Sequence, residues 1–130
     1  MNRKEAREET FILIFEKQFS EETCDSILEL AEQVRDLKPD EYIKRAFFGV
    51  YDNLAEIDSS ISENSVGWSI ERISKTALAV LRLAIYEIKY MDDIPVSVSI
   101  NEAVEILKKY ATKDDASFVN GILGTISKKS

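Results

Sequence analysis

The most constraining feature of this sequence is the run from residue 75 to residue 87, which is apolar around the whole circumference of a helix. Arg82 is the only charged residue between Lys75 and Glu87. A helix that is apolar on all sides is normally buried inside a protein rather than laid on its surface. The run is also short for a membrane span, which needs about 20 predominantly apolar residues. We therefore predict a central core helix against which the other segments pack.

A second helix is predicted after a break at residues 91–95. Pro95 lacks an N–H and restrains the residue before it to extended geometry. The helix is expected to begin at Ser99, because Glu102 three residues later fits a capping box. Its apolar residues recur at helical spacing. They are Ile100, Ala103, Val104, Leu107 and Ala111.

The remaining segments also show helical periodicity. Helices are expected over residues 3–18 and 23–37, from Pro39 at a first helical position, around residues 70–73, and from Asp114 onward. Residues 58–67 are the most loop-like stretch, and the alternative is a short helix that continues through Ile61. The predicted stripes are Ile27, Leu30, Ala31 and Val34 in one helix, and Ile43, Ala46, Phe47, Val50, Leu54 and Ile57 in the next. The fold class is therefore all-α, with about seven helices.

Gly49 interrupts the most regular of these stripes. Glycine inside a helix costs about 1 kcal/mol relative to alanine. We expect that a neighbouring element packs closely against the helix at this position.

Length and cysteine content favour one domain in a reducing compartment. The 130 residues are predicted to form a single helical domain over residues 1–130. Cys24 is the only cysteine, so it has no partner for an intramolecular disulfide. No signal-peptide pattern is recognisable at the first residues. We expect a cytoplasmic protein.

Negative charge is concentrated in one segment. The net charge is −7, and residues 21–41 carry −6 of it, from eight acidic side chains against Arg35 and Lys38. The rest of the chain is close to neutral. The total charge argues against a generic nucleic-acid coat, but it leaves room for a local RNA site elsewhere.

The inventory of reactive side chains argues against an enzyme. Histidine is absent, which removes the commonest general base and metal ligand. With one cysteine, zinc sites and Cys–His pairs are excluded. The four glycines match neither dinucleotide-binding nor phosphate-loop spacing. We therefore expect no catalytic residue, no metal and no cofactor.

Two features could serve binding. Arg3, Lys4 and Arg7 fall within about a quarter of a helical wheel, which fits either a solvated surface or a phosphate contact. Phe118 lies at the edge of its apolar stripe, so it is either a core residue or an aromatic that stacks on an unpaired base. For the other notable residues we expect structural roles: Trp68 in the core, Arg82 paired with Glu87 or Glu102, and Asp114 and Asp115 as helix caps.

Four strings resemble one known family in order and spacing. They are LRLAIYE (residues 81–87), DIP (93–95), SINEAVEI (99–106) and FVNGIL (118–123), and together they resemble the transcription antitermination factor NusB family. The pattern of Arg3, Ala6 and Arg7 is similar to the arginine-rich start of that family. The resemblance covers essentially the whole chain.

This resemblance implies two perpendicular helical subdomains and a function in transcription. Family members bind the boxA element of nascent ribosomal RNA together with a small-subunit ribosomal protein, called NusE in this role. They join the antitermination complex on RNA polymerase. Carried over by position, the resemblance implies RNA contacts at Arg3, Lys4 and Arg7 for phosphates, Phe118 for base stacking, and Asp114 and Ser117 nearby.

The resemblance also indicates where a protein partner binds. A family position associated with the ribosomal protein, often acidic, corresponds to Ala77, and Glu71 is the acidic candidate close to it. Some family members are homodimers that mask the RNA face. An adaptor or homodimer that works through the acidic segment 21–41, without any RNA function, is the main alternative. A targeting domain like that of some ribosomal-RNA methyltransferases is a weaker one.

Overall fold

The computed structural model describes residues 1–129, all of them in helices, turns or short connections. The elements are α1 (Arg3–Lys17), α2 (Cys24–Arg35), α3 (Glu41–Asp52), α4 (Leu54–Asn64), the 3-10 helix η1 (Ile70–Arg72), α5 (Lys75–Tyr90), α6 (Val96–Tyr110) and α7 (Lys113–Lys129). The predicted all-α class is confirmed. None of the helices in the described residues is long and apolar enough to cross a membrane.

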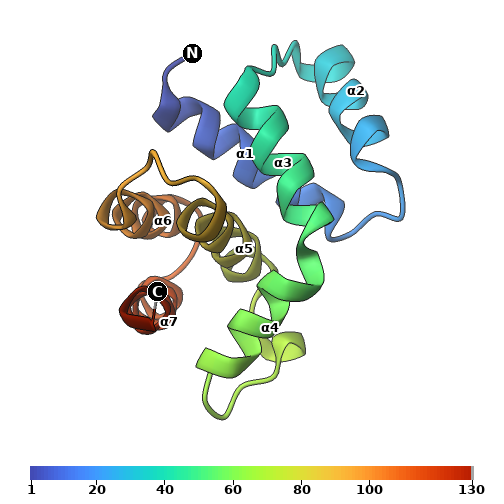
Figure 1. The fold of residues 1–130 in the computed structure, drawn as a ribbon. Coiled ribbons are helices and arrows are strands. Elements are labelled where there is room, and N and C mark those ends of the chain that lie inside the picture. The colour runs from blue at the N-terminus through green and yellow to red at the C-terminus, as the bar shows by residue number, and fades with distance from the viewer. Residues whose placement is uncertain (130) are drawn as a thin grey trace.

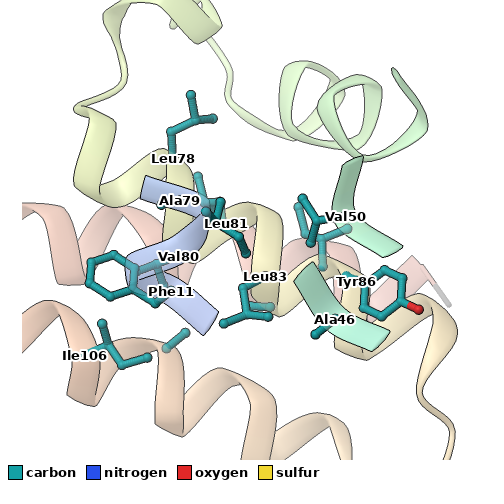
Figure 2. Close-up of a cluster of buried hydrophobic side chains, with 14 of the residues drawn as sticks. Phe11, Ala46, Val50, Leu78, Ala79, Val80, Leu81, Leu83, Tyr86 and Ile106 are labelled. Atoms are coloured by element: carbon teal, nitrogen blue, oxygen red, sulfur yellow. The ribbon is translucent and has the colours of Figure 1, made fainter. Parts of the chain in front are cut away.

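Helix α5 lies at the centre of the molecule. It contacts α1, α3, α4, α6 and α7, and residues 77–87 are all buried. Figure 2 shows Phe11 of α1, Val50 of α3 and Ile106 of α6 converging on its side chains. An apolar circumference needs neighbours on every side, and these helices provide them. The predicted core helix is confirmed.

The helices form two groups that cross each other. Helices α1, α2 and α3 pack together, whereas α6 packs on α5 and α7. In Figure 1 the axes of α6 and α7 point toward the viewer, while α1 and α3 run across the page. The two perpendicular subdomains implied by the sequence resemblance are therefore present. Buried residues of both groups belong to one hydrophobic core, with α5 between them.

Gly49 marks a close approach of α3 to α5. A Cβ atom built on Gly49 of α3 would collide with the ring of Tyr86 on α5. The close packing expected at this glycine is confirmed. Only the missing side chain lets α3 and α5 approach so closely here.

The loop predicted over residues 58–67 is wrong for residues 58–64, which belong to helix α4, and the alternative of a helix through Ile61 is confirmed. Ile57 and Ile61 are fully buried one helical turn apart. This packing stabilises a helix whose serine-rich sequence would not form one in isolation. The predicted third helix is also divided, since α3 ends at Asp52 and α4 begins after Asn53.

Three helix starts differ from the predictions. Pro39 precedes α3 and the cap is Asp40, whose carboxylate accepts a hydrogen bond from the Ile43 N–H at 2.9 Å. Helix α6 begins at Val96, directly after Pro95, rather than at Ser99. At α7 the backbone N–H of Asp115 donates to the hydroxyl of Thr112, so Asp114 and Asp115 lie in the first turn instead of capping it.

Helix α2 is rotated relative to its predicted apolar stripe. Ile27, Leu28 and Ala31 are buried, whereas the side chains of Leu30 and Val34 are 56% and 74% exposed. Figure 1 places α2 at the edge of the molecule. Its main contacts there are with α1 and α3. An edge helix buries a narrow stripe, so the wider predicted one was wrong.

Candidate functional site

The first turn of α1 presents two exposed cations. The side chain of Asn2 caps the helix by accepting a hydrogen bond from the Glu5 N–H at 2.8 Å. Arg3 and Lys4 follow directly and are exposed. Cations at a helix N-terminus oppose the helix dipole, so helix stability does not explain them. Their position suits contact with an anion.

Arg7, one turn further on, is buried and paired. Its side chain donates to the Glu87 carboxylate of α5, with Nε 2.7 Å from Oε2 and Nη2 3.3 Å from Oε1. The hydroxyl groups of Tyr42 and Ser99 donate to the same carboxylate at 2.5 Å and 2.6 Å. Arg7 is 4% exposed and Glu87 is fully buried. This corrects the expectation that Arg7 is available to phosphates, because its charge is already engaged inside the protein.

The buried carboxylate joins four helices and shapes the titration of its neighbours. Arg7, Tyr42, Glu87 and Ser99 come from α1, α3, α5 and α6. Burial disfavours the charged guanidinium of Arg7, but the hydrogen bond and negative charge of Glu87 outweigh it and raise the pKa of Arg7. Burial, together with the charge of Glu87, raises the pKa of the Tyr42 hydroxyl. We call these four residues the buried network.

Arg3 and Lys4 stay exposed although each contacts another side chain of the described residues. The Arg3 guanidinium carbon lies 4.6 Å from the centre of the Tyr42 ring. The Lys4 amine lies 3.1 Å from a carboxylate oxygen of Glu102 on α6, and the Lys4 side chain is 68% exposed. Exposed ion pairs of this kind contribute about 0–1 kcal/mol. A phosphate group can therefore replace Glu102 as the partner of Lys4 at little cost.

A second site lies where α7 begins. Phe118 is partly exposed, and its ring centre is 5.9 Å from that of Trp68. Trp68 is 52% exposed, so the prediction that it belongs to the core was wrong. A pocket of about 260 Å³ opens beside the two rings. Its lining residues are Trp68, Arg72, Ile73, Ser74, Asp114, Asp115 and Phe118, and we call it the aromatic pocket.

The residues predicted near Phe118 divide between two hollows. Asp114 lines the aromatic pocket. Ser117 is exposed and lines a separate groove between α6 and α7, beside Lys113 and Asn120. Trp68 is the functional candidate that sequence reasoning missed. Its one available signal was its position directly after the polar, glycine-containing stretch that ends at Gly67.

The two predicted partner-binding residues have different environments. Glu71 is exposed on η1, between residues that line the aromatic pocket. Ala77 is fully buried in α5, and its backbone N–H donates to the Ser74 hydroxyl. The side chain of Ala77 has no surface to offer, which corrects its assignment as a contact. Glu71 stays a prediction.

Arg82 has a structural partner other than the predicted ones. Its guanidinium forms two hydrogen bonds of 2.9 Å with Asp58 of α4, and Nη1 donates to Gln18 at 3.1 Å. Glu87 and Glu102, the partners expected from the sequence, are engaged elsewhere. Arg82 therefore links α5 to α4 and takes no part in either candidate site.

Comparison with known proteins shows similarity to the NusB family. A profile of the NusB family matches residues 3–128. The transcription antitermination protein NusB of Ruminiclostridium cellulolyticum is 42% identical over 130 residues, which cover 98% of this chain and 90% of that protein. The protein of the same name from Listeria monocytogenes is 39% identical over 127 residues, covering 98% and 97%.

Solved structures agree with this similarity. T. maritima NusB superimposes with a TM-score of 0.87 at 38% identity, covering 99% of this chain and 92% of that one. A crystal structure of the antitermination factors NusB and NusE in complex with double-stranded RNA gives a TM-score of 0.89 at 26% identity. It covers 98% of this chain and 97% of that one.

Proposed function

The chain belongs to the NusB family, and from this premise we propose that it is a transcription antitermination factor that binds the boxA element of nascent ribosomal RNA. It acts with a small-subunit ribosomal protein in the role of NusE and joins the antitermination complex on RNA polymerase. The complex of related NusB and NusE chains with RNA supports both partners. The protein works by binding, without catalytic chemistry, in the cytoplasm.

The observation that carries this proposal is the exposure of Arg3 and Lys4 at the start of α1. In a chain of net charge −7, two exposed cations at a helix N-terminus contribute nothing favourable to the helix dipole. Phosphate contacts explain them. Helix α6 lies between α1 and α7, so an RNA strand that leaves these cations can cross α6 toward Phe118.

Each end of this surface has its own task. Arg3 and Lys4 bind phosphates, which hold the strand without reading its sequence. Phe118 stacks on an unpaired base, and Asp114 and Ser117 lie close enough on α7 to contact the adjoining nucleotides. Arg7 supports α1 from inside through the buried network. Two cations give a weak RNA site by themselves.

The ribosomal protein strengthens this weak site. We place it against η1, where Glu71 is exposed beside the aromatic pocket. If each partner contacts both the protein and the RNA, their binding is coupled by one free energy. The RNA then tightens the binding of the ribosomal protein by the same factor as the ribosomal protein tightens that of the RNA.

The test is fluorescence anisotropy of a labelled boxA-like RNA, with a base-scrambled RNA of equal length as control. The protein is titrated alone and again with the ribosomal protein present. We expect preference for the boxA-like RNA, and tighter binding when the ribosomal protein is added. Equal binding of both RNAs under both conditions would overturn the proposal.

The alternative is a protein-binding adaptor that uses the acidic segment 21–41. Helix α2 within this segment exposes Leu30 and Val34, which gives that alternative a surface. It predicts that the ribosomal protein binds with the same affinity whether or not RNA is present. A coupling factor above one in the titration contradicts it.

A further inference from the structure

We propose that Trp68 and Phe118 together form a binding site for a single unpaired nucleobase, and that the adjacent carboxylates of Asp114 and Asp115 make the site prefer guanine. This inference rests on the proposed RNA-binding function. It adds Trp68 to the site and assigns a base preference to the aromatic pocket.

The two rings provide a stacking surface. Trp68, the only tryptophan of the chain, is 52% exposed. The ring of Phe118 from α7 packs against it, with an angle of 58° between the two ring planes. Their centres are 5.9 Å apart, so the rings already touch and a base cannot insert between them. A base stacks instead on the outer face that the pair leaves exposed. Aromatic stacking of this kind is typical of proteins that bind single strands.

The size of the pocket limits the ligand to one base. Its volume of about 260 Å³ lies just below the roughly 300 Å³ of the smallest pockets that hold drug-sized molecules. Ile73, which is 5% exposed, supplies an apolar wall. A flat ring with an apolar face and a polar edge fits such a site.

The two carboxylates of the pocket favour the edge of a base over a phosphate. Asp114 and Asp115 both line it, and neither forms an ion pair with any residue in the described part of the chain. Ionised carboxylates only accept hydrogen bonds, so they attract N–H groups and repel phosphates. Arg72 at the same pocket can meet the phosphate that follows the bound base.

Guanine offers the best match to a carboxylate. Its Watson–Crick edge carries an imino N–H and an amino group side by side, so one carboxylate can accept two parallel hydrogen bonds. Adenine and cytosine offer an amino group beside an acceptor, and uracil offers a single N–H between two acceptors. Single-stranded RNA is commonly read along this edge. The expected order is guanine first and uracil last.

The experiment uses Trp68 as its own reporter, because no other tryptophan contributes to the fluorescence. Three RNAs of equal length are titrated: all uridine, uridine with one central guanosine, and uridine with one central inosine. Inosine lacks only the amino group of guanosine. We expect saturable quenching of Trp68 by the guanosine RNA and about tenfold weaker binding of the inosine RNA, the effect of one hydrogen bond to a charged group.

Variants separate stacking from general RNA binding, with anisotropy of the labelled guanosine RNA as the readout. Trp68→Ala is expected to weaken binding by about tenfold, as the loss of one stacked base requires. Trp68→Phe keeps an aromatic face and stays within about threefold of the unchanged protein. Val66→Ala is the matched control, since Val66 is a neighbouring side chain that is 90% exposed. Replacing both carboxylates, Asp114→Asn with Asp115→Asn, is expected to remove the difference between guanosine and inosine.

The outcomes distinguish this inference from the proposed function. RNA binding that leaves Trp68 fluorescence unchanged, or that Trp68→Ala does not weaken, overturns the base site and leaves the proposed function standing. The ribosomal protein is placed beside this pocket, so it can change Trp68 fluorescence without RNA. The base site is overturned if saturating ribosomal protein abolishes the quenching by the guanosine RNA. No binding of any RNA, even with the ribosomal protein present, overturns both.

Discussion

The two ends of the proposed RNA surface differ in whether their charged side chains form ion pairs. At the start of α1 the cations have partners from the chain itself: Arg7 is buried against Glu87, and Lys4 pairs with Glu102 at the surface. At the aromatic pocket, Asp114 and Asp115 form no ion pair within residues 1–129.

This contrast shows that the sign of a residue does not tell what it contributes to binding. Of the basic residues Arg3, Lys4 and Arg7, the buried Arg7 stabilises the fold and the two exposed residues remain for a ligand. Carboxylates, which oppose RNA binding in general, become useful where they can face a base edge. For the basic residues of α1, burial decides whether the charge is available to a ligand. For the carboxylates, the shape of the pocket decides whether they can contact a base.

The largest expected effect comes from breaking the buried network. Arg7→Ala leaves the Glu87 carboxylate buried without its cation, and removal of one partner from a buried pair costs about 3–5 kcal/mol. Urea denaturation followed by circular dichroism measures this loss. Lys4→Ala, which removes an exposed cation from the same helix, is the control. A cost below about 1 kcal/mol for Arg7→Ala would mean that the network does not hold the fold.

The next effect concerns the aromatic end. Phe118→Ala is expected to weaken RNA binding by about 1–3 kcal/mol, the range for one stacked base. Phe118 also packs against the core, so the folded fraction is checked by circular dichroism before each titration. Phe118→Tyr keeps the ring and serves as the control. RNA affinity unchanged in a folded Phe118→Ala protein would restrict the site to the α1 end.

The sequence was sufficient for most of the fold because burial follows apolar periodicity when a helix is central. The run at 75–87 has only one possible environment, and Gly49 signalled a close approach that Tyr86 provides. The edge helix α2 and the serine-rich α4 were less predictable. The buried face of α2 and the extent of α4 depend on the neighbouring helices that cover them. The local sequence does not reveal these neighbours.

The candidate site was only partly predictable for the same reason. Arg3, Lys4 and Arg7 look equivalent on a helical wheel, and the difference arises from Glu87, which is 80 residues away from Arg7 along the chain. Trp68 was assigned to the core, and tryptophan is indeed highly buried on average. Its exposure follows from its place on the connection between α4 and η1, outside any helix.

A smaller effect is the pH dependence that Tyr42 of the buried network gives to the free energy of unfolding. Burial and the charge of Glu87 raise the pKa of Tyr42 above the value near 10 of an unfolded tyrosine. The stabilisation is therefore complete below about pH 10, and it is lost as the pH rises, because the unfolded state then releases a proton that the folded state retains. Each such tyrosine lowers the free energy of unfolding by about 1.4 kcal/mol per pH unit in this range.

The check is a series of urea denaturations from pH 9 to pH 11.5. Tyr42→Phe is expected to flatten the decline above pH 10, although not to remove it, because burial also raises the pKa of Tyr51. Tyr110→Phe is the matched control, since Tyr110 is 42% exposed. A decline of equal slope in both variants would show that Tyr42 does not titrate with unfolding.

The smallest expected effect on stability belongs to the exposed pair of Lys4 and Glu102 at the start of α1, and it tests the same contrast between buried and exposed cations. Lys4→Ala is expected to change the free energy of unfolding by no more than about 1 kcal/mol, because the pair with Glu102 is exposed. In RNA binding, the same variant should reduce the slope of log affinity against log salt by about 0.7, the value for one phosphate contact on a single strand.

Glu102→Gln frees Lys4 and removes a negative charge, so it is expected to tighten RNA binding at low salt. Glu105→Gln, which disrupts the exposed pair with Lys108 on the same helix, is the control for net charge. If both glutamine variants tighten binding equally, net charge explains the gain and Lys4 is not specifically released. If Glu102→Gln alone does so, the first turn of α1 holds a cation that the chain itself restrains and RNA takes over.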